Sequence, residues 1–262
     1  MAGAVSAPLL VARDGDVVTV TLNRPEFGNA VDLPTARGLR AAISEAESAG
    51  ASVLVVAARG KVFCAGGDVA SMAAHAEMGA YLDELAGTMH EALAAMSASP
   101  LFVISAVAGA AAGGGLGLAL TADYVMATPA ATFLTAYARV GLTPDSGVSA
   151  LLVRSAGMHR ALALAATGRV LTAEEAHRWG LVAEVVPEGE FERVVAERAA
   201  ELALTAGPAL AETKRLIRAA AETGYVAQLE DEQRTIARAA ATEHAQSRIR
   251  QFTARKPRPS AG

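Results

Sequence analysis

Two glycine-rich segments, roughly fifty residues apart, most limit the folds that this chain can adopt. The first glycine corner is Phe63–Asp68 (FCAGGD) and the second is Gly113–Gly117 (GGGLG); each lies between a strand-like run and a stretch with helical character. Such a corner leaves backbone N–H groups without an intrahelical acceptor, at the positive end of the helix dipole. Two corners that converge could bind one oxygen atom as it gains negative charge.

Strand-like and helical segments alternate along most of the chain, which favours an α/β fold. We expect a hairpin with its turn at Asp14-Gly15, and then a helix that Asp32 caps. The expected elements are a hairpin at 9–22, a helix at 33–48, a strand at 53–58, a helix at about 79–98, a strand at 101–107 and a short strand at 124–127.

After Val186 the sequence becomes almost entirely helical. Pro208 is expected to begin one helix, and a second should run from about Tyr225 to Arg248. We therefore divide the chain into a core, residues 1–200, and a helical region, residues 201–262, which serves either as a cap or in oligomerisation.

With 262 residues, of which 52% are hydrophobic and 19% charged, the chain can form a sizeable core. A net charge of −4 argues against a general nucleic-acid-binding protein, because neutralising phosphates requires a basic surface. Cys64 is the only cysteine, so no intramolecular disulfide is possible, and residues 1–8 lack the pattern of a signal peptide. These features predict a cytoplasmic protein.

The segment Leu101–Ala122 has no charged residue, and its glycines at 109, 113 and 117 have the spacing of a transmembrane helix contact. Its first part, however, is strand-like, and three consecutive glycines interrupt any continuous helix. We expect a buried strand, a tight corner and a buried helix here, and no membrane span.

Glycine-rich turns also bind nucleotides, or simply permit close packing of the backbone. Neither GxxxxGK[ST] nor GxGxxG occurs in the chain, which argues against a P-loop and a dinucleotide-binding fingerprint. The five histidines show no spacing typical of metal ligands, so no metal site is predicted. Close packing alone remains an alternative for each glycine corner taken singly.

The segments LNRP (Leu22–Pro25), Asn29-Ala30, the first glycine corner and Ala106–Gly115 resemble, in order and spacing, the enoyl-CoA hydratase/isomerase (crotonase) superfamily. Gly141–Pro144 and the helical C-terminus also fit, so the resemblance covers nearly the whole chain. It implies a spiral of ββα units with a C-terminal helical trimerisation region, assembled as a homotrimer or a dimer of trimers. It also implies an acyl-CoA thioester substrate, with coenzyme A as part of the substrate and no other cofactor.

The resemblance further implies that the backbone amides of Gly67 and Gly114 bind the thioester oxygen as an enolate forms. Further candidates for substrate binding are Arg24, Ala30, Ala65, Gly66, Asp68 and Tyr137. Two of them have ordinary alternatives: Arg24 could be a solvated loop residue, and Asp68 could cap the helix after the first glycine corner.

The chain departs from the pattern of the hydratases in this superfamily, which use two glutamates to handle water. One of these positions is Gly117 here, and the other falls near Tyr137. Glycine has no side chain to act as a base, and tyrosine, with an ordinary pKa of about 10, is a poor base at neutral pH. Hydration is therefore not expected, although a hydratase-like activity stays an alternative.

Asp145, in the segment Thr143–Gly147 (TPDSG), is the remaining candidate base. Taken alone, it could be a turn residue or the cap of a helix that begins near Gly147. Isomerases of the superfamily carry a single Asp or Glu directly after this proline, and one carboxylate can remove a proton at one carbon and return it at another. We therefore predict an enoyl-CoA isomerase, either of the Δ3,Δ2 type or a ring-modifying enzyme of the phenylacetate-degradation type.

Two alternatives of other kinds stay open. Asp145 could act as a nucleophile in an acyl-CoA hydrolase or dehalogenase, with Tyr137 and His90 contributing to the site. The chain could also be a non-catalytic protein that binds CoA esters. Asp145→Ala distinguishes an isomerase from a binding protein. An isomerase would lose turnover in this variant and keep ligand binding, whereas a binding protein would show no turnover even as the wild type.

Overall fold

The computed structural model describes residues 7–205 and 207–254 of the chain. The chain divides into two compact units, Met1–Gly207 and Pro208–Gly262. The expectation about a signal peptide falls largely on residues 1–6, which lie outside the described residues.

A six-stranded sheet, with the strand order β1-β2-β3-β5-β7-β10, forms the base of the first unit. β1 and β2 form the predicted antiparallel hairpin, and the other neighbours are all parallel. The strands are β1 (Leu9–Asp14), β2 (Val17–Leu22), β3 (Val53–Ala58), β5 (Phe102–Val107), β7 (Tyr124–Ala127) and β10 (Glu184–Val185). The continuous apolar runs of β3 and β5 fit parallel strands that are covered on both faces.

A second, smaller sheet has the strand order β4-β6-β8-β9. Its first three strands each follow a central strand of the large sheet in the sequence. Its strands are β4 (Val62–Cys64), β6 (Ala110–Ala112), β8 (Thr132–Leu134) and β9 (Leu171–Thr172). Three times in succession a strand of the large sheet leads to a strand of the small sheet and then to a helix, as β3-β4-α2, β5-β6-α4 and β7-β8-α5. The predicted spiral of ββα units is therefore confirmed.

Helices cover both faces of the large sheet. Leu54 and Val56 of β3 point into the larger apolar core with α1 and α3, whereas Val53 and Val55 point to the opposite face, toward α8. The helices of this unit are α1 (Leu33–Ser48), α2 (Val69–Ala74), α3 (Met78–Ala98), α4 (Gly114–Thr121), α5 (Val148–Ala156), α6 (Met158–Thr167), α7 (Ala173–Arg178) and α8 (Phe191–Thr205), with short 3-10 turns at Pro25–Phe27, Tyr137–Val140 and Glu188–Glu190.

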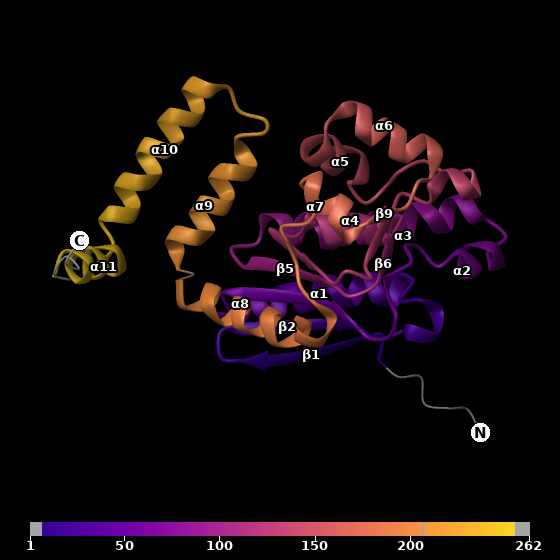
Figure 1. Ribbon diagram of the computed structural model, residues 1–262, viewed down its shortest axis with the longest axis horizontal. Helices are drawn as coiled ribbons and strands as arrows, with labels where there is room; N and C mark the ends of the chain where they lie inside the picture. Colours follow the sequence, from indigo (N-terminus) through magenta and orange to yellow (C-terminus); the bar gives the residue numbers. More distant parts are fainter. Residues whose placement is uncertain (1–6, 206, 255–262) are drawn as a thin grey trace, which may run out of the picture. The chain divides into compact units, whose positions relative to one another are not determined.

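α8 lies along the strands of the large sheet (Figure 1). Its residues Phe191, Val195 and Ala199 are buried in the apolar cluster on that face. Leu202 and Ala203 also pack against this cluster, and the boundary between the two compact units lies after α8, at Gly207, whereas we predicted it after residue 200.

The uncharged segment Leu101–Ala122 forms β5, β6 and α4, as expected from its change of character at the glycines. Among the described residues, no helix has both the length and the apolar composition to cross a membrane. The hairpin at Leu9–Leu22 and the N-cap at Asp32 are also as predicted, since the Asp32 side chain accepts a hydrogen bond from the Thr35 backbone N–H at 2.9 Å.

The second unit contains α9 (Pro208–Ala219), α10 (Tyr225–Ala240) and α11 (Glu243–Ala254). The prediction of one continuous helix from Tyr225 to Arg248 is wrong. The Thr242 hydroxyl accepts a hydrogen bond from the Ala245 backbone N–H at 3.2 Å and so caps a new helix.

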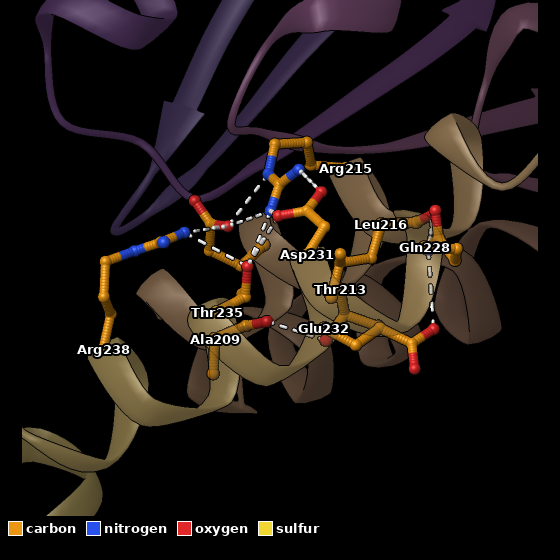
Figure 2. A network of polar contacts seen from close by, with 10 residues as sticks. Ala209, Thr213, Arg215, Leu216, Gln228, Asp231, Glu232, Thr235 and Arg238 are labelled. Carbon is orange, nitrogen blue, oxygen red and sulfur yellow. Dashed lines mark hydrogen bonds and ion pairs between the residues drawn. The ribbon is translucent and has the colours of Figure 1, made fainter. Parts of the chain in front are cut away.

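Arg215 on α9 connects this helix to α10 through a network of polar contacts (Figure 2). Its guanidinium donates two hydrogen bonds to the Asp231 carboxylate, at 2.6 and 3.1 Å, and others to Glu212 and to the Thr235 hydroxyl. The Gln228 amide nitrogen on α10 also donates to the Leu216 carbonyl on α9, at 3.0 Å. Hydrogen bonds from Arg215 and from Gln228 therefore both connect α9 to α10.

Candidate active site

The two glycine corners are in contact with each other. They follow β4 and β6, which are parallel neighbours in the small sheet, so both corners leave that sheet at the same edge. Gly66 and Gly113 have φ values of +97° and +53°, a region that favours glycine. A Cβ atom on Gly66 would lie 2.9 Å from the Ala112 carbonyl oxygen and 3.2 Å from the Gly114 nitrogen. The corners therefore need glycine both for their turns and for their close approach.

The amides of Gly67 and Gly114 are free to bind a ligand. Gly114 is the first residue of α4, where an N–H has no intrahelical acceptor. Gly67 lies between two backbone hydrogen bonds with Val31, which use the Gly66 carbonyl and the Asp68 N–H. Within residues 7–205 and 207–254, neither amide has an acceptor, and both glycines line one cavity of about 390 Å³. These two donors can hold the oxygen of a polarised carbonyl.

The wall of this cavity is largely apolar. Side chains from α2 and α3 supply much of it, namely Val69, Met72, Leu82, Leu85, Ala86 and Met89. Val140 and Leu142 add to it from the segment before Asp145, and the Met72 methyl group covers Gly67. A hydrophobic group of a ligand can therefore be buried next to the free amides.

Asp145 lines the same cavity and is oriented by Tyr137. The Tyr137 hydroxyl donates a hydrogen bond to Asp145 Oδ1 at 2.6 Å. Burial, together with this hydrogen bond and the charge of Asp145, raises the pKa of the Tyr137 phenol well above its usual value, so the phenol remains a donor. Among the described residues, Asp145 Oδ2 has no hydrogen-bond partner. One carboxylate oxygen is thus held, and the other is available to a substrate.

Asp145 does not cap the next helix. α5 starts after Gly147, and no side chain caps it. The backbone carbonyl of Asp145, and not its carboxylate, accepts the hydrogen bond from the Val148 N–H at 3.0 Å. The cap interpretation of this aspartate is therefore wrong.

Gly117, one of the two positions at which the hydratases carry a glutamate, has no space for a side chain. It is buried on α4, and a Cβ atom there would overlap the Ser146 carbonyl oxygen and lie 2.7 Å from Ser146 Cβ. The other such position is close to Tyr137, whose hydroxyl is bonded to Asp145. Asp83 on α3 brings a second carboxylate to the cavity, but its side chain is exposed to solvent.

Of the predicted substrate-binding residues, Ala65, Gly66 and Tyr137 line the cavity. Arg24, Ala30 and Asp68 instead form a group beside it. Arg24 donates to the Ala30 carbonyl and, at 3.0 Å, to Asp68 Oδ2, and its side chain is 15% exposed, so it is not a solvated loop residue.

Asp68 also caps α2, as its alternative interpretation predicted, by accepting a hydrogen bond from the Ser71 N–H at 3.1 Å. Burial would raise the pKa of the Asp68 carboxyl, but the Ser71 N–H and the Arg24 guanidinium outweigh it and lower this pKa. Contact of Arg24, Ala30 or Asp68 with a substrate stays a prediction.

Cys64 provides a test of the burial at the first glycine corner. The thiol is fully buried, and desolvation raises its pKa from 9.0 to about 11, although a hydrogen bond from the Gly66 backbone acts in the opposite direction. The unfolded chain loses this proton near pH 9 and the native protein only near pH 11, so stability should fall as the pH rises between these values, by roughly 2–3 kcal/mol.

Urea unfolding of the wild type and of Cys64→Ala at pH 8 to 11 measures this effect. The free energy of unfolding should decline more steeply with pH in the wild type than in the variant. Equal slopes would show that the thiol is not buried as described.

Several residues at the site are not identifiable from the sequence alone, among them the polar residues Asp83, His90 and Ser146 and much of the apolar wall. The apolar residues Leu82, Leu85 and Met89 recur at the spacing of one face of α3, and this pattern is the sequence signal for the wall of the cavity. The sequence suggests His90 only as a contributor to the nucleophilic alternative, and its contact with the backbone of Ser146 has no sequence signal.

Comparisons with known proteins identify the family of the chain. The family model described as "Enoyl-CoA hydratase/isomerase" matches residues 12–259. The chain is 39% identical over 214 residues, 81% of its own length and 82% of the other, to a protein of Rhodobacter capsulatus named "Probable enoyl-CoA hydratase". It is 35% identical over 184 residues, 69% of its length and 70% of the other, to the trans-2-decenoyl-[acyl-carrier-protein] isomerase of Streptococcus mutans.

The fold is similar to a crystal structure of an enoyl-CoA hydratase from Polaromonas sp. JS666, with a TM-score of 0.89, 31% identity, and coverage of 95% of this chain and 98% of that one. The converging glycine corners, the ββα spiral and the family match lead to one conclusion. The chain belongs to the enoyl-CoA hydratase/isomerase (crotonase) family.

Proposed function

We propose that this protein is an enoyl-CoA isomerase in which Asp145 moves a proton between two carbons of the acyl chain. One observation carries the proposal. The Asp145 carboxylate, held at one oxygen by Tyr137 and free at the other, lines the same cavity as the Gly67 and Gly114 amides, whereas Asp83, the other carboxylate there, is exposed to solvent.

In the proposed mechanism, the thioester oxygen of a 3-enoyl-CoA accepts hydrogen bonds from the Gly67 and Gly114 N–H groups. Asp145 removes a proton from the carbon next to the carbonyl, and the electron pair of that C–H bond delocalises onto the oxygen as a dienolate. Loss of one such preorganised donor typically costs about 3–4 kcal/mol in the transition state. Asp145 then returns the proton to the far carbon, so the double bond becomes conjugated and no water is consumed.

Hydration is less well supported by the same residues. Adding water across a double bond in the manner of the hydratases requires a pair of carboxylates, and the packing of Ser146 leaves no space for one at Gly117. The similar proteins carry both hydratase and isomerase names, so the choice between these reactions depends on the site.

The wall of the cavity favours a linear acyl chain over an aromatic acyl group. Tyr137 is the only aromatic residue among the described residues that line it. A dehalogenase with Asp145 as nucleophile would also require an aromatic cage and a histidine available for the reaction. His90 Nε2, however, already accepts a hydrogen bond from the Ser146 N–H. Both features support the Δ3,Δ2 type of isomerase over a dehalogenase or a ring-modifying enzyme.

A panel of CoA esters tests the proposal. The purified protein is incubated with 2-enoyl- and 3-enoyl-CoA esters of several chain lengths, and products are analysed by mass spectrometry and NMR. The expected product has an unchanged mass and a moved double bond. Addition of water, or binding with no turnover of any ester, would contradict the proposal.

We also propose that the helical second unit mediates assembly into a trimer or a dimer of trimers. Its helices expose large apolar side chains, each 69–79% exposed, namely Ile217, Tyr225, Val226, Ile236 and Phe252. Exposed apolar groups in this number are typical of a surface that binds another protein chain. Native mass spectrometry at micromolar concentration should give a mass of three or six chains, and a monomer there would contradict this proposal.

A further inference from the structure

A hydrogen bond joins α3 to the segment that carries Asp145. The Ser146 backbone N–H donates to His90 Nε2 at 3.0 Å. Because a backbone N–H can only donate, Nε2 must carry its lone pair, which places the proton of the neutral imidazole on Nδ1. This contact therefore requires one protonation state and one tautomer of His90.

The backbone that this bond holds has an unfavourable conformation. Ser146 has a φ of +52°, although it is not a glycine, and Gly147 follows with a φ of +73°. A left-handed conformation is unfavourable for a residue other than glycine and persists only where its surroundings enforce it. Ser146 is 2% exposed, so its N–H would be left without a partner if His90 did not accept it.

Ser146 also sets the place of Asp145 relative to the free amides. A Cβ atom on Gly114 would lie 3.1 Å from Ser146 Oγ and 3.8 Å from Asp145 Oδ1, and Gly117 packs against the Ser146 backbone. The turn at Ser146 is thus where α3, α4 and the Asp145 segment meet. A shift of this turn would move the carboxylate away from a substrate bound at Gly114.

We propose that His90 is a positioning residue for Asp145. As a hydrogen-bond acceptor it fixes the left-handed turn at Ser146, and through that turn it holds the carboxylate beside the carbons of the bound acyl group. This role of His90 rests on the proposed function, in which Asp145 is the base. It gives His90 no contact with substrate and no part in proton transfer.

Two variants show whether His90 acts only as a hydrogen-bond acceptor or takes part in the reaction through its imidazole. In His90→Gln the side-chain oxygen can still accept from the Ser146 N–H, whereas His90→Leu cannot accept. Since small displacements of a catalytic group cost up to about 100-fold in rate, His90→Leu should lose about 10- to 100-fold in kcat with KM little changed, and His90→Gln should recover most of that loss. Glu91→Gln, an exposed change on the same helix, is the control and should match the wild type.

Equal losses in the Gln and Leu variants would show that the imidazole itself acts in the reaction, and normal kcat in His90→Leu would show that the contact does no positioning. Either result overturns the proposal. A wild type that isomerises no ester refutes the proposed function instead, and the experiment below still tests the contact.

A measurement on the wild type remains decisive if the leucine variant does not fold. Nitrogen-15 NMR of histidine-labelled protein, with the His90 signals assigned from His90→Gln, should show the Nδ1–H tautomer at the pH of the assay. Hydrogen exchange of the Ser146 amide should be slow. An Nε2–H tautomer or a rapidly exchanging amide would rule out the contact.

Discussion

Asp145→Asn should lower kcat for double-bond migration by about 10²- to 10⁴-fold, which is the usual contribution of a general acid–base. Asparagine keeps the size of the side chain and an oxygen that can accept from the Tyr137 hydroxyl, so the geometry of the cavity should persist. The Kd for a non-reacting acyl-CoA should change little, because the Gly67 and Gly114 amides remain. Steady-state kinetics and calorimetric titration measure the two quantities.

Asp83→Asn is the matched control for this experiment. Asp83 lines the same cavity and the variant removes the same charge, but the Asp83 side chain is exposed to solvent. Its kcat should remain close to that of the wild type. Comparable losses in both variants would mean that the charge of the cavity, and not one base, determines the rate.

Gly117→Glu should destabilise the protein and should not produce a hydratase. The new Cβ atom would overlap the Ser146 carbonyl, and overpacking of this kind typically costs about 1–3 kcal/mol before any charge is buried. Displacement of Ser146 should also reduce the isomerase kcat, because that residue adjoins Asp145. Urea unfolding and assays of water addition to a 2-enoyl-CoA measure these effects.

Gly117→Ala isolates the steric part of this cost, and Gly87→Ala is its control. Gly87 lies on α3, where an added Cβ would meet nothing within 4 Å. There alanine should stabilise the helix by up to about 1 kcal/mol. If Gly117→Glu folded with wild-type stability and hydrated a 2-enoyl-CoA, the packing at Ser146 would not be what excludes hydration.

Local signals were sufficient to predict much of the fold. The turn at Asp14-Gly15, the cap at Asp32 and the glycines of the second corner each define a chain reversal or a helix start within a few residues. The contact between the two glycine corners also follows once β4 and β6 are parallel neighbours, since both corners then leave the same sheet edge. The sequence therefore predicts that Gly67 and Gly114 lie close together, and the resemblance to the family adds the expectation that their amides bind an oxyanion.

The contacts around the base could not be predicted in this way. The bond from Tyr137 to Asp145 depends on a short 3-10 turn, and the bond from Ser146 to His90 joins residues 56 positions apart. Such contacts are decided by packing between elements and not by local propensity. The break between α10 and α11 was missed for a different reason, since a single threonine cap at Thr242 outweighs a continuous helical pattern.

The most direct test of a lone base working with two amides is the fate of solvent oxygen. The wild-type protein is incubated with a 3-enoyl-CoA in water labelled with oxygen-18, and the mass and ultraviolet spectrum of the product are recorded. We expect a conjugated 2-enoyl-CoA of unchanged mass that carries no label. A product heavier by one labelled water would contradict the account, because hydration would then occur without the pair of glutamates that the hydratases use, at Gly117 and near Tyr137.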